Sequence, residues 1–169
     1  MKNKQEMLYR RSIRLKGYDY ATPGIYFLTI CTKDRNDLFG EIISRQMSLN
    51  DLGNIIAEDW KAISERISVV RIEEFVIMSN HLHGLIEIQD RQLSPDEKRW
   101  NLGQIVTYFK YRSTKRYNYL LESGDLWKLW QRNYYEHIVR NERSLVAIRE
   151  YIFSNPLNWA EDPDNVTNR

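Results

Sequence analysis

Apolar and polar positions follow two different periods along this chain. Several runs are rich in β-branched and aromatic residues, are bounded by turn residues, and have the length of a strand. Two of them are separated only by Ser79 and Asn80, which favours an antiparallel hairpin. The predicted strands are Gly24–Thr32, Val69–Met78 and His81–Ile88, with shorter ones at Glu41–Ile43 and, at a sheet edge, Tyr134–Val139.

Apolar residues at steps of three and four positions predict three helices. The first follows Asn50, a residue type that often caps a helix N-terminus. The last must end near Asn155, because Pro156 disfavours helical geometry in the residue before it. The predicted helices are Asn50–Ile67, Asn101–Leu121 and Glu142–Asn155.

The order of these elements, βαββα(β)α, predicts an α+β fold in which helices pack on an antiparallel sheet. No linker or repeat divides the 169 residues, so we expect one domain over 1–169. Residues 1–20 would form a basic N-terminal extension, and residues 160–169 a polar, frayed tail.

Composition excludes several classes of protein. Hydrophobic residues make up 42% and charged residues 28%, which is typical of a folded domain and not of a disordered chain. The one cysteine, Cys31, cannot form an internal disulfide, which suits a reducing compartment. No signal-type or membrane-spanning run is present, so a cytoplasmic location without membrane association is expected.

Positive charge is concentrated in two segments although the net charge is only +2. Residues 1–17 contain six Lys or Arg against one Glu. Residues 108–119, "YFKYRSTKRYNY", contain four cations, five aromatics and no acid. Cations that track phosphates and rings that stack on unpaired bases are the usual means of binding single-stranded nucleic acid. A solvated helix face with aromatics in the core is the competing interpretation.

The segment "VIMSNHLHGLIEI" contains two of the three histidines, His81 and His83. Side chains two apart on a strand share a face, so both imidazoles project together while Leu82 faces the other way. Two adjacent imidazoles can chelate one divalent cation. They can equally be two half-buried strand residues with hydrogen-bonded rings, and spacing alone leaves both interpretations open.

The third helix adds a second pair. Tyr151 and Asn155 are four residues apart and therefore share one helical face. A phenol can attack a phosphodiester when its ionisation is assisted, and an amide oxygen is a suitable ligand for a hard cation. A helical tyrosine in a core, followed by "SNP" as a helix stop, is the simpler alternative.

Four blocks together resemble the REP-associated tyrosine transposases, within the single-tyrosine HUH transposases. They are "RRSIRLKGYDYATPGIYFLTICT", "FVIMSNHLHGLIEI", "LWQRNYYEHIVRNERS" and "IREYIFSNPLNW", and they span roughly Arg10 to Trp159. The resemblance implies the HUH endonuclease fold, a ferredoxin-like sandwich. It also implies that His81 and His83 hold Mg²⁺ or Mn²⁺, with Asn155 as third ligand, and that Tyr151 is the nucleophile.

The function that this resemblance implies is cleavage and rejoining of single-stranded DNA near hairpins, through a 5′-phosphotyrosine intermediate. A non-catalytic protein that binds DNA or RNA hairpins and keeps the fold is the alternative. Either a monomer or a homodimer is compatible with the family. The residues expected to contact DNA are Arg10, Arg11, Arg14, Lys16, Lys110, Arg112, Lys115 and Arg116.

Other titratable residues are weaker candidates for the site. His137 is expected to be structural, although proton transfer or a DNA contact is open to it. Glu87 shares the histidine face but lies too far along the strand to be a direct ligand. Glu73 and Glu74, on the neighbouring strand, are the reserve ligands should Asn155 lie too far away.

Overall fold

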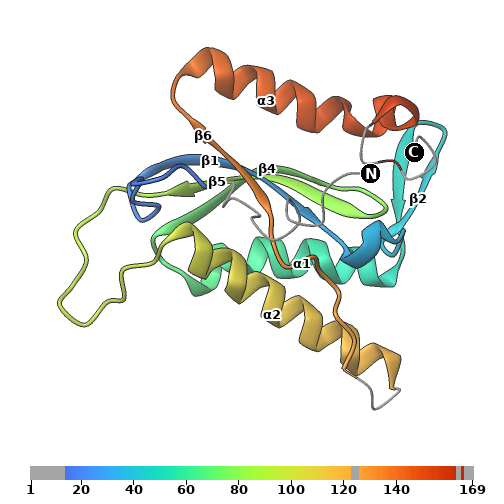
Figure 1. Cartoon of the computed structure of the whole chain (residues 1–169), viewed down its shortest axis with the longest axis horizontal. Helices are drawn as coiled ribbons and strands as arrows, with labels where there is room; N and C mark the ends of the chain where they lie inside the picture. Colours follow the sequence, from blue (N-terminus) through green and yellow to red (C-terminus); the bar gives the residue numbers. More distant parts are fainter. Residues whose placement is uncertain (1–13, 123–125, 163–164, 166–169) are drawn as a thin grey trace, which may run out of the picture.

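The chain is built around a four-stranded antiparallel sheet with helices on both faces (Figure 1). The structure, a computed structural model, describes residues 14–122, 126–162 and 165. The strands lie in the order β4-β5-β1-β6. Their bounds are Gly24–Cys31 (β1), Val70–Ile77 (β4), His81–Ile88 (β5) and Tyr135–Val139 (β6).

Helices α1 (Asp51–Arg66) and α2 (Leu102–Leu121) cover one face of the sheet, and α3 (Glu142–Ser154) covers the other (Figure 1). The predicted α+β class, the predicted hairpin and all three helices are therefore confirmed. Helix α1 begins where expected, because the Asn50 side chain accepts a hydrogen bond from the Gly53 amide at 2.9 Å. Among the described residues, no helix combines the length and the apolar character that a membrane crossing requires.

Strand β5 is the centre of the molecule, since it is buried on both faces. Leu82, Ile86 and Ile88 belong to the large core that α1 and α2 close, in which Trp60 is fully buried. Leu85, on the opposite face, packs with Leu145 and Ile152 of α3. The alternation of a strand thus gives β5 one purely apolar face and one face on which the two histidines precede Leu85.

Two short strands form a separate sheet and correct one expectation. β2 (Gly40–Ile43) pairs with β3 (Gln46–Leu49), and not with the main sheet. The two-residue turn between them places Ser44 and Arg45 at positive φ, 50° and 64°. This backbone conformation is typical of a tight hairpin turn, in which glycine or asparagine is the usual residue. Because neither Ser44 nor Arg45 is of these types, the sequence did not predict the turn or the strand β3 that follows it.

The segment after α3 corrects a second expectation. The chain continues into a 3₁₀ helix, η2 (Asn155–Glu161), and a shorter one, η1 (Lys33–Arg35), follows β1. The frayed tail expected from residue 160 is wrong for its first residues, since Asp162 is only 6% exposed. Pro156 occupies the first turn of η2, where its missing amide hydrogen would have no partner in any case. Pro156 therefore ends α3 and begins η2.

Gly84 supplies a direct test of how tightly β5 packs on α1. A Cβ at this position would lie 2.6 Å from Trp60 Cζ2, so Gly84→Ala should lower the free energy of unfolding by about 1–3 kcal/mol. Urea denaturation measures this. Gly103→Ala, in the first turn of α2, is the matched control: its Cβ would meet the flexible guanidinium of Arg14 at 3.2 Å and the side-chain oxygen of Asn101 at 3.3 Å. The control should be neutral or stabilising by up to about 1 kcal/mol. Equal losses in both variants would contradict the close packing of β5.

Candidate active site

His81 and His83 lie at the start of β5 on the face that α3 covers. They are 0% and 2% exposed, and their ring centroids are 4.4 Å apart. Burial lowers the pKa of His81 to about 3, with the charge of Arg35 adding to the effect. Burial, followed by the proximity of His81, also lowers the pKa of His83 well below its usual value. Both rings are therefore neutral at neutral pH, the form in which imidazole nitrogens bind metals.

The proton on His81 is located by its neighbour Asn80. The Asn80 amide nitrogen donates to the carbonyl of Arg35 at 3.3 Å, which directs the amide oxygen to His81 Nδ1 at 2.9 Å. An amide oxygen only accepts, so Nδ1 carries the proton and Nε2 presents a lone pair. His81 Nε2 is buried and has no hydrogen-bond partner among the described residues.

His83 is held from two sides. Its Nδ1 lies 2.8 Å from Thr29 Oγ1 on β1, the register partner of His83. Its Nε2 lies 3.1 Å from the Tyr151 hydroxyl on α3. Phe27 stacks on the His83 ring at 5.4 Å and meets Tyr151 edge-on at 6.0 Å. On the sheet face that α3 covers, the phenol thus lies directly against one of the two imidazoles.

One stripe of side chains on α3 and η2 covers this pair of histidines. Tyr151, Asn155, Trp159 and Asp162 follow each other at intervals of four, four and three residues, which keeps them on one side of a helical backbone. Trp159 lies over His81, with ring centroids 5.8 Å apart. Sequence reasoning singled out only the first two members. Their spacing continues through Trp159 to Asp162, but Pro156 was interpreted as the end of the helix.

Asp162 orients the amide of Asn155. The amide nitrogen donates to Asp162 Oδ2 at 3.1 Å, so the amide oxygen points elsewhere. Asn155 is 1% exposed, and its Oδ1 has no hydrogen-bond partner among the described residues. Buried polar atoms without a partner are rare and costly. Asn155 Oδ1 and His81 Nε2 are two such atoms at one site, and both are lone-pair donors. The residues present therefore fit a divalent cation.

The Tyr151 phenol is not activated by its protein surroundings. Burial raises its pKa, the charge of Asp162 raises it further, and the hydrogen bond with Asn155 opposes both. Its side chain is nevertheless 41% exposed, so a substrate can reach it. A phenol in this position needs an added positive charge to ionise at neutral pH.

The reserve carboxylates are engaged elsewhere. Arg149 of α3 pairs with Glu74 at 2.9 Å and with Glu73 at 3.2 Å. Glu87 pairs with Arg71, also at 2.9 Å. Across the described part of the chain, no three His, Cys, Asp or Glu side chains are grouped so as to hold a metal ion. An amide ligand, Asn155, is therefore the protein group best placed to complete the site.

Three of the four α2 cations expected to contact DNA are engaged within the protein. Lys110 Nζ donates to the backbone carbonyls of Gln131 and Asn133 at 2.9 and 3.0 Å. Arg112 and Arg116 both reach the buried Asp59 carboxylate of α1, at 3.3 and 3.1 Å. These contacts join α2 to its neighbours. Lys115 is exposed and remains the α2 cation best placed for a phosphate.

The N-terminal candidates fall into three situations. Arg10 and Arg11 lie outside the described residues. Arg14 donates to the Tyr134 hydroxyl at 2.9 Å and lies over the Tyr134 ring, whereas Lys16 is exposed. His137, which was expected to be structural, is exposed on the edge strand β6.

An antiparallel sheet that presents two paired histidines to a tyrosine helix is the arrangement that the resemblance to single-tyrosine HUH transposases implied. Residues 23–155 match the IS200-like transposases, and the chain belongs to this family. It is 45% identical over 168 residues to an uncharacterized protein of Haemophilus influenzae (strain ATCC 51907 / DSM 11121 / KW20 / Rd), covering 91% of this chain and 92% of that protein.

The likeness to REP-associated tyrosine transposases is confirmed by two further comparisons. A protein of the same H. influenzae strain, described as a transposase of that type, is 22% identical over 142 residues, covering 82% of this chain and 73% of the relative. A solved REP-associated tyrosine transposase bound to a REP hairpin has the same fold. Its TM-score is 0.62 at 16% identity, with 86% of this chain and 73% of that chain covered.

The interpretation of Lys110 can be tested against Lys115. Burial lowers the pKa of Lys110 to about 8, and its removal would leave the carbonyls of residues 131 and 133 without their donor. Lys110→Met should therefore lower the free energy of unfolding by about 1–3 kcal/mol. Lys115→Met, exposed on the same helix, should change it by less than about 0.5 kcal/mol. Thermal denaturation checks both. If Lys110→Met is as stable as the parent protein but binds DNA more weakly, Lys110 is a DNA contact instead.

Proposed function

We propose that this transposase cleaves and rejoins single-stranded DNA by transesterification at Tyr151. The observation that carries the proposal is the phenol of Tyr151, partly exposed and 3.1 Å from His83, beside the unpartnered oxygen of Asn155. Each group has a fixed orientation before substrate arrives, which is how positioning contributes to phosphoryl transfer.

In the cleavage step, the Tyr151 oxygen attacks the scissile phosphorus. A new oxygen–phosphorus bond forms, the bond to the 3′ oxygen breaks, and the phenol proton is lost as the departing oxygen gains one. The products are a 5′-phosphotyrosine linkage and a free 3′-hydroxyl. One phosphodiester is exchanged for another, so a 3′-hydroxyl can reverse the reaction and rejoin strands without ATP.

We propose His81, His83 and Asn155 as ligands of Mg²⁺ or Mn²⁺. When bound, such a cation neutralises charge on the phosphate and favours ionisation of the phenol. The protein contributes the orientation of the ligands: Asn80 holds the His81 ring, Thr29 holds His83, and Asp162 holds the Asn155 amide. When Nδ1 of His83 carries the proton, Nε2 has one lone pair, so it cannot accept a hydrogen bond from Tyr151 and bind a cation at once.

The proposed substrate is single-stranded DNA beside a hairpin. The structural relative was solved with a REP hairpin, and the family is one of transposases. Lys16 and Lys115 are exposed cations that could contact the hairpin, with Arg10 and Arg11 as further candidates. A cytoplasmic location and a homodimer stay predictions.

Tyr151→Phe removes the hydroxyl that is proposed both to attack the DNA and to compete with the cation for His83 Nε2. The variant should form no covalent adduct with hairpin-bearing single-stranded DNA, as read by denaturing electrophoresis and mass spectrometry in Mn²⁺. Its affinity for Mn²⁺ should be equal to or up to about tenfold above that of the parent protein, because the hydroxyl no longer competes for His83 Nε2. His81→Ala and His83→Ala should lose both Mn²⁺ binding, measured by calorimetry, and cleavage.

Three outcomes of that experiment would count against the proposal. An adduct that persists in Tyr151→Phe would remove the tyrosine from its role. Full cleavage in EDTA would argue against a metal. A parent protein that binds hairpins tightly but never forms an adduct would favour the non-catalytic regulator.

Asp162 tests the assignment of Asn155 as third ligand. Asp162→Ala leaves every proposed ligand in place but frees the Asn155 amide to rotate, and loss of such an orienting partner typically costs about 10–100-fold in metal affinity. Asp90→Ala removes the same charge just beyond the far end of β5 and should leave the affinity for Mn²⁺ unchanged. If the two variants bind Mn²⁺ equally well, Asn155 is not the third ligand.

A further inference from the structure

The edge strand β6 does not follow β1 to its end. Tyr135 is the partner of Thr29, and the next bridge joins Trp130 to Thr32. Between these pairs, two residues of β1 face four residues, 131–134, on the other side. The intervening chain must therefore bulge away from the sheet. Bulges of this kind are over-represented beside active sites, where they redirect side chains.

The bulge has fixed anchors at both ends. Lys110 Nζ donates to the carbonyls of Gln131 and Asn133, and Arg14 donates to the hydroxyl of Tyr134 at 2.9 Å. The backbone amide of Gln131 donates to the backbone carbonyl of Cys31 at 3.0 Å, and this bond closes the far end of the bulge. Two cations thus hold one short loop, Lys110 through its backbone carbonyls and Arg14 through the side chain of Tyr134.

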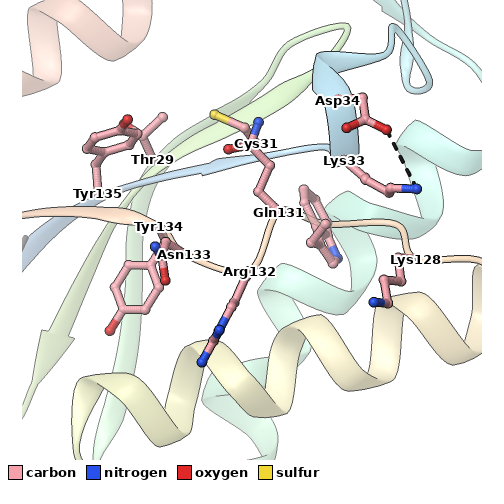
Figure 2. A pocket seen from close by; sticks show the side chains of 11 residues that line it. Thr29, Cys31, Lys33, Asp34, Lys128, Gln131, Arg132, Asn133, Tyr134 and Tyr135 are labelled. Atoms are coloured by element: carbon pink, nitrogen blue, oxygen red, sulfur yellow. Dashed lines mark ion pairs between the residues drawn. The ribbon is translucent and has the colours of Figure 1, made fainter. Parts of the chain in front are cut away.

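A pocket of 690 Å³ lies between this loop and the end of β1 (Figure 2). Its volume falls within the range of about 300–1,000 Å³ that small ligands occupy. Figure 2 shows Thr29 and Tyr135 together at one side of the pocket and Lys33 and Lys128 at the other. Arg132 is a third cation in the lining, against one acid, Asp34. The charge of the lining favours an anion.

The pocket adjoins the candidate active site and is separated from it by one buried side chain. His83, Thr29 and Tyr135 are register partners on three adjacent strands and so form one row across the sheet. Thr29 both lines the pocket and lies 2.8 Å from His83 Nδ1, so a single side chain separates the pocket from the histidine that contacts Tyr151. The ring of Tyr135 is 51% exposed at the end of this row.

We propose that this pocket, which we call the edge pocket, binds a nucleotide of the DNA strand whose scissile phosphate lies at Tyr151. Its base stacks on Tyr135, and its phosphates are neutralised by Arg132 and Lys128. The combination of an exposed ring and exposed cations is the one by which proteins hold single strands without reading their sequence. This proposal rests on the proposed function, because that function places the strand at Tyr151.

The test uses the full chain with Tyr151→Phe, so that binding is measured without covalent capture. The probe is fluorescein-labelled (dT)₁₂, followed by anisotropy over a range of salt concentrations. Tyr135→Leu should weaken binding about fivefold or more, and Tyr135→Phe, which keeps the ring, should restore it. Arg132→Ala should lower the slope of log affinity against log salt by about 0.7, the value for one phosphate of a single strand. Arg66→Ala, an exposed cation in the last turn of α1 on the other face of the sheet, should leave the slope unchanged.

A crosslinking measurement locates the strand directly. (dT)₁₂ with one 5-iododeoxyuridine, irradiated on the same protein, should yield a peptide crosslinked at Tyr135. The proposal is overturned if Tyr135→Leu and Arg132→Ala bind like the parent protein, or if crosslinks fall only outside the edge pocket. The measurements can refute the pocket proposal and the catalytic proposal independently of each other. An adduct at Tyr151 together with unaffected pocket variants refutes only the pocket, whereas pocket crosslinks without any adduct refute only the catalytic function.

Discussion

The chemistry of this protein depends on how two buried imidazoles are hydrogen bonded. Each ring is held through Nδ1, His81 by Asn80 and His83 by Thr29, and Nε2 of His83 contacts Tyr151 on α3. Such burial would be costly for charged rings, and it lowers the pKa of both, so both are neutral at neutral pH. Neutral, oriented imidazoles are what a metal-assisted site requires, and they are a poor choice for a purely apolar core.

The two layers of helices support this arrangement in different ways. Helices α1 and α2 bury the apolar face of β5, and the contact between Trp60 and Gly84 leaves no room for a side chain at the residue after His83. That contact supports the histidine-bearing strand from the sheet face opposite to the histidines. Helix α3 supplies the reactive groups from the front, and its ion pairs with Glu73 and Glu74 join it to β4. Exposed pairs of this kind contribute little energy singly, so the apolar contacts of Leu85, Leu145 and Ile152 carry most of its docking.

Much of this could be predicted from the sequence, since the periodicity of apolar residues directly reflects burial. The strands of the main sheet, the three α-helices and the shared face of His81 and His83 follow from it. Features that depend on which residues meet in three dimensions could not be predicted this way. Lys110, Arg112 and Arg116 form a basic run in the sequence, yet their partners are backbone carbonyls twenty residues on and a carboxylate on α1 more than fifty residues before. Trp159 and Asp162 were missed because Pro156 was interpreted only as the end of a helix. Proline is equally compatible with the first turn of the next helix, which is where Pro156 lies.

Several cations that were expected to contact DNA are engaged within the protein, and this changes where single-stranded DNA is expected to bind. A charge that is already paired with Asp59 or with the bulge carbonyls has little left to offer a phosphate, because a new partner must replace the existing one. The basic face of α2 is therefore mainly a structural element. Through Lys110 it fixes the loop that contains Arg132, so part of the positive charge in α2 acts indirectly, by building the edge pocket. The row from His83 through Thr29 to Tyr135 then connects the histidine pair with the cations at the edge of the sheet.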